Sequence, residues 1–280
     1  MKNYFIAAAL LVTTMGTAQQ RDTTQAPGGR AGMPSMAGMA GMAGMGGARQ
    51  APKAFKDVIT SKAVSQKGLF TVHKVEDKYY FEIPNSLMGR EILAVTRYVK
   101  VPAVGGGRGV YGGEIANQQT MRFEKGPSSN IFLRGIALIS NANPTDDIYK
   151  AVTNSNLNAI AAAFPIAAFS KDSSGVVIDV TDYFKGDNPL VSVSSQVKRT
   201  LSLTQISADR SYIDKISSYP INTEIRTVKT FGSSAAGGGF GGASPAPTAS
   251  IPTANGNNAI TIELNTSLLL LPAKPMAAKM

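Results

Sequence analysis

The feature that most constrains the fold of this chain is a strict alternation of apolar and polar side chains along short segments. Residues 69–84, LFTVHKVEDKYYFEIP, are the clearest case. If Glu76 and Asp77 form a turn, this segment is a hairpin whose successive side chains point to opposite faces. One face is then apolar and is predicted to be buried; it carries Phe70, Val72, Tyr79, Phe81 and Ile83.

The other face of the hairpin is polar and holds the only histidine among the 280 residues. It carries Thr71, His73, Tyr80 and Glu82, with His73 directly opposite Tyr80. Polar side chains that face one another across strands commonly stabilise the sheet itself. We therefore expect His73 to be a partly exposed strand residue without a catalytic role.

Similar segments recur along the chain and determine the predicted fold class. Gly, Pro and Ser residues separate them, as is typical of turns between antiparallel strands. Short helices are predicted at residues 84–89 and 145–154, with Asn85 and Thr145 as caps, while 54–68 is read as a short helix or an extended arm. The chain is thus predicted to be mostly β, with sandwich-like antiparallel sheets and few short helices. The further predicted strands lie within residues 90–101, 118–126, 130–140, 159–184 and 259–272.

The first 52 residues are predicted to precede the folded part. Residues 1–18 combine Lys2, a short apolar run, and the small residues Gly16 and Ala18 before a cleavage point, which indicates a signal peptide. Residues 19–52 form a low-complexity Gly/Ala/Met linker, predicted to be a disordered tether. Two interpretations fit the methionines that recur every third residue. They are simple low complexity, or they bind Cu(I), which thioethers suit; the methionines are Met33, Met36, Met39, Met42 and Met45.

Composition excludes several classes of protein. The chain has no cysteine, which rules out disulfides and thiolate metal sites. No segment after the signal peptide reaches the roughly 20 apolar residues of a transmembrane helix. The net charge of +10 is dispersed, its longest basic run being Lys198-Arg199, so we expect no nucleic-acid partner. The predicted location is the periplasm, the cell envelope or the extracellular space.

The exported part is predicted to divide at a glycine-rich stretch. Residues 53–102 form a first small module, residues 103–113 a Gly-rich loop, and residues 114–276 a β-rich second domain. A low-complexity insert at 233–258 is expected to be an exposed loop of the second domain, because another strand-like segment follows it. Residues 277–280 are a tail.

Motifs for catalysis or cofactor binding are weak. Gly107, Gly109 and Gly112 have the spacing of a dinucleotide fingerprint, but a strand-like segment follows them where that fingerprint requires a helix. A zinc site needs three or four ligands of fixed geometry, and one histidine without cysteine supplies few. We therefore predict no catalytic, cofactor-binding or metal-binding residues in this chain.

Three aspartates within residues 179–187 are the remaining candidates for acid–base catalysis or calcium binding. Asp179 and Asp182 are three residues apart, so on an uninterrupted strand they would point to opposite faces. Together with Asp187 they do not have the spacing of an EF-hand loop. Turn and capping roles are therefore expected for these aspartates.

Several blocks, taken in order, resemble a known family. They lie within residues 53–276 and read FKDVITSKAVSQKGLFTVHKVEDKYYFEIPNSLMGREILAVTR, MRFEKGPSSNIFLRG, AVTNSNLNAIAAAFPIAAFSKDSSGVVIDVTDYFKGD, DRSYIDKISSYPINTEIRTVKTF and ELNTSLLLLPAKPM. Together these blocks resemble the N-terminal domains, of unknown function, of exported bacterial zinc-dependent metalloproteases of the met-zincin type. In that family an H-E-x-x-H helix supplies two zinc-binding histidines and a general base.

The departure from the family pattern limits what the resemblance implies. No H-E-x-x-H motif occurs in the 280 residues, so no catalytic or zinc-binding residue is carried over. The resemblance implies a non-catalytic N-terminal region, a truncated or fragment chain, that supports a missing protease domain and contacts its protein or peptide substrate. Zinc is expected only in that missing domain. The alternative is a free-standing cell-envelope module that binds a glycan or a protein.

Overall fold

The computed structural model describes residues 51–101, 111–137, 145–233, 251–252 and 258–273. They belong to one compact unit, Gln50–Met280. The predicted signal peptide, residues 19–50 of the predicted tether with its methionines, and most of the insert at 233–258 lie outside the described residues, as do Gly107 and Gly109. No helix in the described part of the chain is long and apolar enough to cross a membrane.

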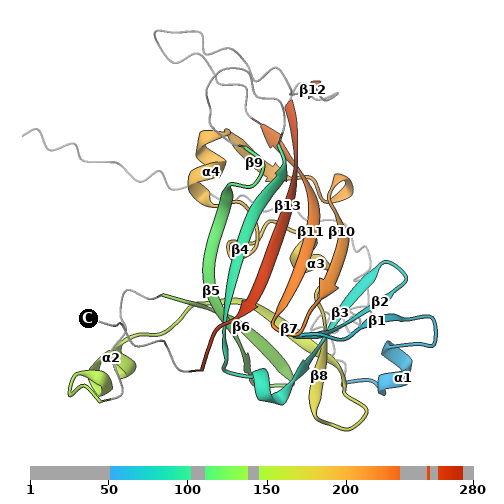
Figure 1. The fold of residues 1–280 in the computed structure, drawn as a ribbon, viewed down its shortest axis with the longest axis vertical. Helices are drawn as coiled ribbons and strands as arrows, with labels where there is room; N and C mark the ends of the chain where they lie inside the picture. The colour runs from blue at the N-terminus through green and yellow to red at the C-terminus, as the bar shows by residue number, and fades with distance from the viewer. Residues whose placement is uncertain (1–50, 102–110, 138–144, 234–250, 253–257, 274–280) are drawn as a thin grey trace, which may run out of the picture. The chain divides into compact units, whose positions relative to one another are not determined.

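The described unit is built from antiparallel strands, which confirms the predicted fold class (Figure 1). All strands belong to one continuous sheet with the order β1-β2-β3-β8-β7-β6-β5-β4-β13-β11-β10, to which β12 and β9 add at β13 and β11. The strands are β1 (Val64–Gln66), β2 (Thr71–Val75), β3 (Lys78–Pro84), β4 (Glu91–Lys100), β5 (Ile115–Lys125), β6 (Asn130–Ile136), β7 (Ile160–Phe169), β8 (Gly175–Asp179), β9 (Leu203–Ile206), β10 (Tyr212–Ser218), β11 (Asn222–Ser233), β12 (Ile251–Pro252) and β13 (Asn258–Leu270).

The sheet curls until its two ends meet. The amide of Leu69, which precedes β2, donates to the carbonyl of Tyr219 after β10 at 2.6 Å. The hydroxyl of Ser218 in β10 donates to the carbonyl of Phe70 at 2.7 Å. The curled sheet therefore packs its core between facing strands, as a sandwich does, although all of its strands belong to one hydrogen-bonded series.

The core fills the inside of this curl. The larger cluster includes Phe70, whose ring centroid lies 5.0 Å from that of Phe81 and 5.7 Å from that of Phe123. A smaller cluster at the other end of the long strands includes Tyr98 and Phe231. Burial of these aromatic side chains is the main favourable contribution to stability in a chain without disulfides.

The hairpin of β2 and β3 has the predicted register. Val75 pairs with Lys78, so Glu76 and Asp77 form the turn, and His73 pairs with Tyr80. Glu76 adopts φ 54°, a left-handed conformation that closes such a two-residue turn. The predicted inner face, which includes Phe81 and Ile83 at 0 % exposure, is buried.

The helices are few and short, as predicted, but not all were expected. The 145–154 segment forms α2, which begins at Tyr149 with Ile148 and not Thr145 at its N-cap position. Helices α3 and α4 were not predicted, because they lie in stretches that the sequence predicts to be mostly strand. α3 lies at the end of the segment 159–184, which was predicted to be a hairpin. The helices are α1 (Phe55–Val58), η2 (Asn85–Leu87), α2 (Tyr149–Ser155), α3 (Thr181–Lys185), α4 (Ser195–Thr200) and η3 (Ala208–Arg210).

Candidate functional site: the polar groove beside helix α1

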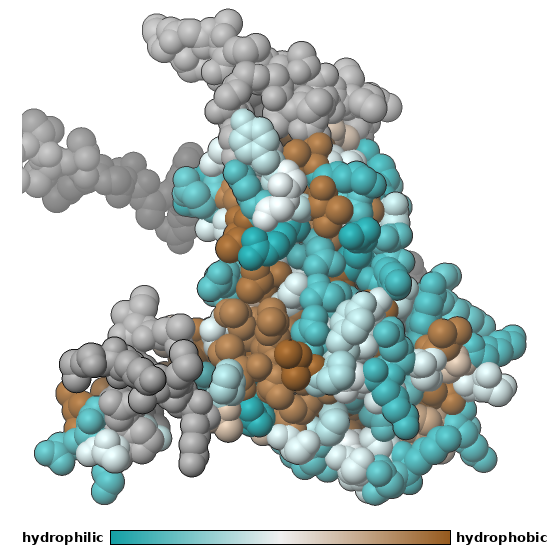
Figure 2. Space-filling model, viewed as in Figure 1, coloured by the Kyte–Doolittle hydropathy of each residue, from teal (hydrophilic) through white to brown (hydrophobic). Residues whose placement is uncertain are grey.

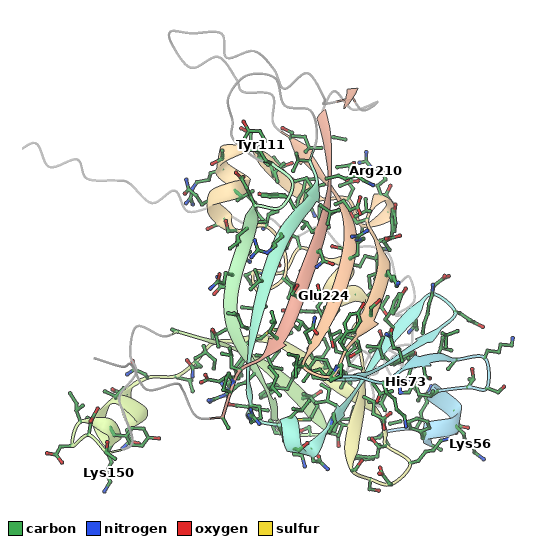
Figure 3. All side chains as sticks on the ribbon, in the orientation of Figure 1. Lys56, His73, Tyr111, Lys150, Arg210 and Glu224 are labelled. Atoms are coloured by element: carbon green, nitrogen blue, oxygen red, sulfur yellow. The ribbon has the colours of Figure 1, made fainter. Side chains whose placement is uncertain are left out.

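A polar concave surface lies where α1 covers the outer face of the β2–β3 hairpin. We call it the His73 groove; its volume is about 910 Å³. Figure 3 shows His73 and Lys56 of α1 in this corner of the structure. Lysines, hydroxyls and carboxylates share its lining, which includes Phe55, Ser65, Lys67, Thr71, His73, Glu82, Ser170, Lys171 and Asp172.

A line of hydrogen bonds runs across three strands at the floor of the groove. Ser65 Oγ of β1 lies 2.7 Å from His73 Nδ1, and His73 Nε2 lies 2.9 Å from Glu82 Oε2 of β3. Because a carboxylate only accepts, His73 donates its Nε2 proton to Glu82, and the Ser65 hydroxyl is the partner of His73 Nδ1. The arrangement has the order of donor, imidazole and carboxylate that activates a serine nucleophile in hydrolases.

His73 is buried, with 4 % exposure, which corrects our expectation that it is partly exposed. Two elements cover it. β1 pairs with β2 so that Ser65 faces His73, and the ring of Phe55 in α1 meets the imidazole edge-on with 5.9 Å between centroids. The sequence predicts a short helix or an extended arm over residues 54–68 and no strand at 64–66, so the predicted hairpin has no neighbouring strand over its polar face.

Ser65 is the functional candidate that sequence reasoning missed. β1 has three residues, all exposed, so it shows no alternation of apolar and polar side chains. The only sequence signal was the polar outer face of the hairpin, to which an edge strand with hydroxyl side chains can pair. The Ser65–His73–Glu82 line links β1, β2 and β3, and its first effect is to hold the edge strand on the sheet.

A second groove lies on the other side of α1, with a volume of about 780 Å³. Tyr80, Lys78 and Asp179 line part of it. Lys78 Nζ donates to Asp179 Oδ2 at 3.0 Å, and this hydrogen bond raises the pKa of Lys78. Burial, and then the charge of Asp179, raise the pKa of Tyr80. The phenol of Tyr80 is thus kept protonated and can serve as a hydrogen-bond donor.

The aspartates considered from the sequence have structural roles. β8 ends at Asp179, whose Oδ1 accepts from the amide of Thr181 at 3.0 Å, so it forms the predicted turn at the start of α3. Asp182 lies within α3, not on a strand. Asp187 Oδ2 lies 2.5 Å from Lys198 Nζ. Within the described ranges, no group of three or more His, Asp or Glu side chains is placed to hold a metal ion.

Lys229 of β11 is the most unusual titratable side chain, because it is fully buried. Its Nζ donates to the carbonyl of Phe184 at 2.7 Å and to that of Gly186, at the end of α3. Burial lowers the pKa of Lys229 to about 8, while Asp187 opposes this shift and Lys198 adds to it. A cation at the carbonyl end of a helix is favourable, so Lys229 fixes α3 to β11.

Comparisons with known proteins identify two segments of the chain. The sequence pattern described as "Domain of unknown function (DUF5118)" matches residues 52–101. The pattern described as "Domain of unknown function (DUF5117)" matches residues 113–280. No curated protein and no solved structure matches the chain.

Proposed function

The chain belongs to the DUF5117 family, and from this premise we propose that it is a non-catalytic N-terminal region of an exported zinc-dependent metalloprotease. Its role is to support a protease domain, which supplies the zinc and the H-E-x-x-H helix. The sequence blocks within residues 53–276 support the assignment, because they resemble the N-terminal domains of such enzymes in their order.

The observation that carries the proposal is that the polar candidate residues form hydrogen bonds or ion pairs with other elements of the chain. His73 is held between Ser65 and Glu82, Asp179 forms the turn that leads into α3, and Asp187 pairs with Lys198. Each of these groups stabilises the connection between two elements, which is the behaviour expected of a supporting framework.

The two matched segments also act as one framework. β4 comes from the segment 52–101, yet it lies in the sheet between β5 and β13 of the segment 113–280. β3 of the first segment pairs with β8 of the second. A partner domain would therefore contact a single body formed by both segments.

Metal analysis together with a peptidase assay tests the proposal. The purified chain is expected to contain no stoichiometric zinc and to show no casein cleavage that a chelator abolishes, because zincin hydrolysis needs a metal-bound water and a positioned base. One zinc per chain with chelator-sensitive cleavage contradicts the proposal. The gene should also either continue in frame into a region that encodes an H-E-x-x-H motif or be followed by such a region.

A second candidate function is a cell-envelope module that binds a glycan or a protein, and the His73 groove favours it. Lys67 and Lys171 can donate, Glu82 and Asp172 can accept, and the Phe55 ring offers a face for stacking. Polyhydroxylated ligands require both donors and acceptors, because each hydroxyl donates and accepts hydrogen bonds. Saturable binding to cell-wall glycans that Phe55→Ala abolishes would favour this function over the first.

A further inference from the structure

Three exposed lysines from three different segments line the His73 groove. They are Lys56 of α1, Lys67 between β1 and β2, and Lys171 between β7 and β8. None of them forms an ion pair with another side chain within the described ranges. The Nζ of Lys171 lies 5.5 Å from the centroid of the Phe55 ring, and this cation–π contact holds the ammonium group at the groove. The three ammonium groups are therefore available to a ligand.

The two carboxylates of the lining are already engaged by groups of the chain. Glu82 Oε2 accepts from His73 Nε2 at 2.9 Å. Asp172 Oδ1 accepts from the amide of Ser174 at 3.0 Å, within the turn between β7 and β8. Three lysines against two carboxylates leave the lining with an excess of positive charge. This excess attracts an anionic group into the groove.

The groove on the other side of α1 has the opposite balance of charge. Its lining has four carboxylates against three lysines: Asp57, Glu76, Asp77 and Asp179 against Lys53, Lys62 and Lys78. Figure 2 shows that the surface around α1 and the β2–β3 hairpin is mainly hydrophilic. The uncompensated positive charge thus gathers on one side of α1, which the dispersed net charge of the whole chain does not explain.

The other polar side chains of the His73 groove are mainly hydroxyls, those of Thr60, Ser61, Ser65, Thr71, Ser170 and Ser174. Ser170 is 5 % exposed, and its Oγ has no hydrogen-bond partner in the part of the chain that the structure describes. A buried hydroxyl without a partner is unfavourable, so a ligand that bonds to it recovers free energy. Each hydroxyl donates and accepts, as the hydroxyls of a saccharide do.

The walls of the groove are fixed to the sheet. The amide of Lys53, just before α1, donates to the carbonyl of Ala167 in β7 at 2.8 Å. The side chain of Gln66 in β1 donates to the carbonyl of Ser218 at 3.1 Å and so holds the segment that carries the second lysine. A preformed site loses little conformational entropy on binding. The groove volume of about 910 Å³ suits a small ligand, since such sites measure roughly 300 to 1,000 Å³.

We propose that the His73 groove binds an acidic saccharide. Its carboxylate or phosphate contacts Lys67 and Lys171, and its hydroxyls bond to Ser170 and the neighbouring hydroxyl side chains. This inference rests on the second function proposed above, the cell-envelope module, and adds the chemical class of the glycan. It does not depend on a protease domain.

Calorimetric titration of the purified chain with trigalacturonate and with glucose 6-phosphate tests the proposal. Binding of either probe supports it and identifies the anionic group. Lys67→Gln and Lys171→Gln should each weaken that binding at least about threefold, because each removes a charged donor. Lys150→Gln is the matched control and should bind as the wild type does, since Lys150 is equally exposed and lies in α2, far from His73 in Figure 3.

Ser170→Ala provides a second readout that does not depend on charge. It should weaken binding while leaving the unfolding temperature unchanged or raised, because it removes a buried hydroxyl that has no partner. Salt should weaken the binding of the acidic probe, since raising the ionic strength from about 0.01 M to about 1 M shortens the Debye length from about 30 Å to about 3 Å.

The methyl ester of trigalacturonate separates this proposal from the function on which it rests. If the neutral ester binds as tightly as the acid and Phe55→Ala abolishes both, the glycan-binding function stands and the acidic class is wrong. Equal binding of triglutamate would show that charge alone is recognised, and would overturn the saccharide. Equal losses in Lys150→Gln, or no saturable binding of either acidic probe at millimolar concentration, would also overturn the proposal. Binding of neutral cell-wall glycans then decides the cell-envelope function separately.

Discussion

At the scale of single residues, the two faces of the β2–β3 hairpin are buried by different parts of the molecule: the core covers the inner face, and Phe55 and β1 cover His73 on the outer face. Phe81 and Val72 follow from the period of two, because the alternation is strict and the turn is short. His73 was misjudged, since its cover comes from Phe55 and from β1, whose three exposed residues carry no periodic signal. A side chain's burial depends on neighbours that alternation within its own strand does not reveal.

Two substitutions in the hairpin should differ in cost. Phe81→Ala removes a side chain that stacks on Phe70 at 5.0 Å, and should lower the free energy of unfolding by about 3 to 5 kcal/mol. His73→Ala removes two hydrogen bonds and leaves Glu82 without its imidazole donor, which should cost about 1 to 3 kcal/mol. Urea denaturation of both variants measures these costs. A loss below about 0.5 kcal/mol for His73→Ala would show that the Ser65–His73–Glu82 line is not structural, as for an ordinary surface site.

The buried Lys229 predicts a specific dependence of stability on pH. Burial lowers its pKa from the usual 10.5 to about 8. Between these values the unfolded chain binds a proton that the folded chain has released, so the free energy of unfolding should rise with pH by about 1.4 kcal/mol per unit. Lys229→Met removes this contribution, whereas the exposed lysines titrate equally in both proteins. Denaturation from pH 7.5 to 10.5 should therefore show the free energy of unfolding of the wild type rising relative to that of the variant; parallel profiles would contradict the lowered pKa.

At the scale of elements, strands that alternate over several residues were predictable, and short elements set by local hydrogen bonds were not. β4 and β13 were recognised from ten or more residues of pattern. α3 has five residues and begins where Asp179 turns the chain, so VIDVTDYF reads as one strand unless that turn is known. In the candidate site, the hairpin was predicted while α1 remained one of two options and β1 was not assigned.

The pairing of β3 with β8 depends on a glycine. A Cβ at Gly175 would lie 2.6 Å from the carbonyl oxygen of Ile83, a backbone atom that cannot move alone. Gly175→Ala should therefore lower the free energy of unfolding by about 1 to 3 kcal/mol through overpacking. Gly135→Ala is the matched control, because its Cβ would meet only the flexible Leu190 side chain at 3.3 Å. Thermal unfolding of the pair measures the difference, and equal losses would disprove this account of the β3–β8 contact.

At the scale of the whole molecule, the N-terminal region predicts export. The Gly16-x-Ala18 pattern after a short apolar run should be cleaved behind Ala18. N-terminal sequencing of the protein from an expressing bacterial host should begin at Gln19, and Ala18→Leu should block processing because the cleavage site requires a small residue. An intact N-terminus on protein recovered from the cytoplasm would refute this prediction.

The pairing of β4 with β13 also governs when the molecule can fold. Thr96 and Thr266, 170 positions apart, share a hydrogen bond at the centre of the sheet. Contacts of such long range form slowly, because the loop between them must close first. During synthesis β4 and β5 emerge early, but the gap beside β4 stays open until the ribosome has passed residue 270. A chain that lacks β13 cannot complete its sheet while it is translated, and an incompletely folded chain is the form that a secretion channel can thread across a membrane.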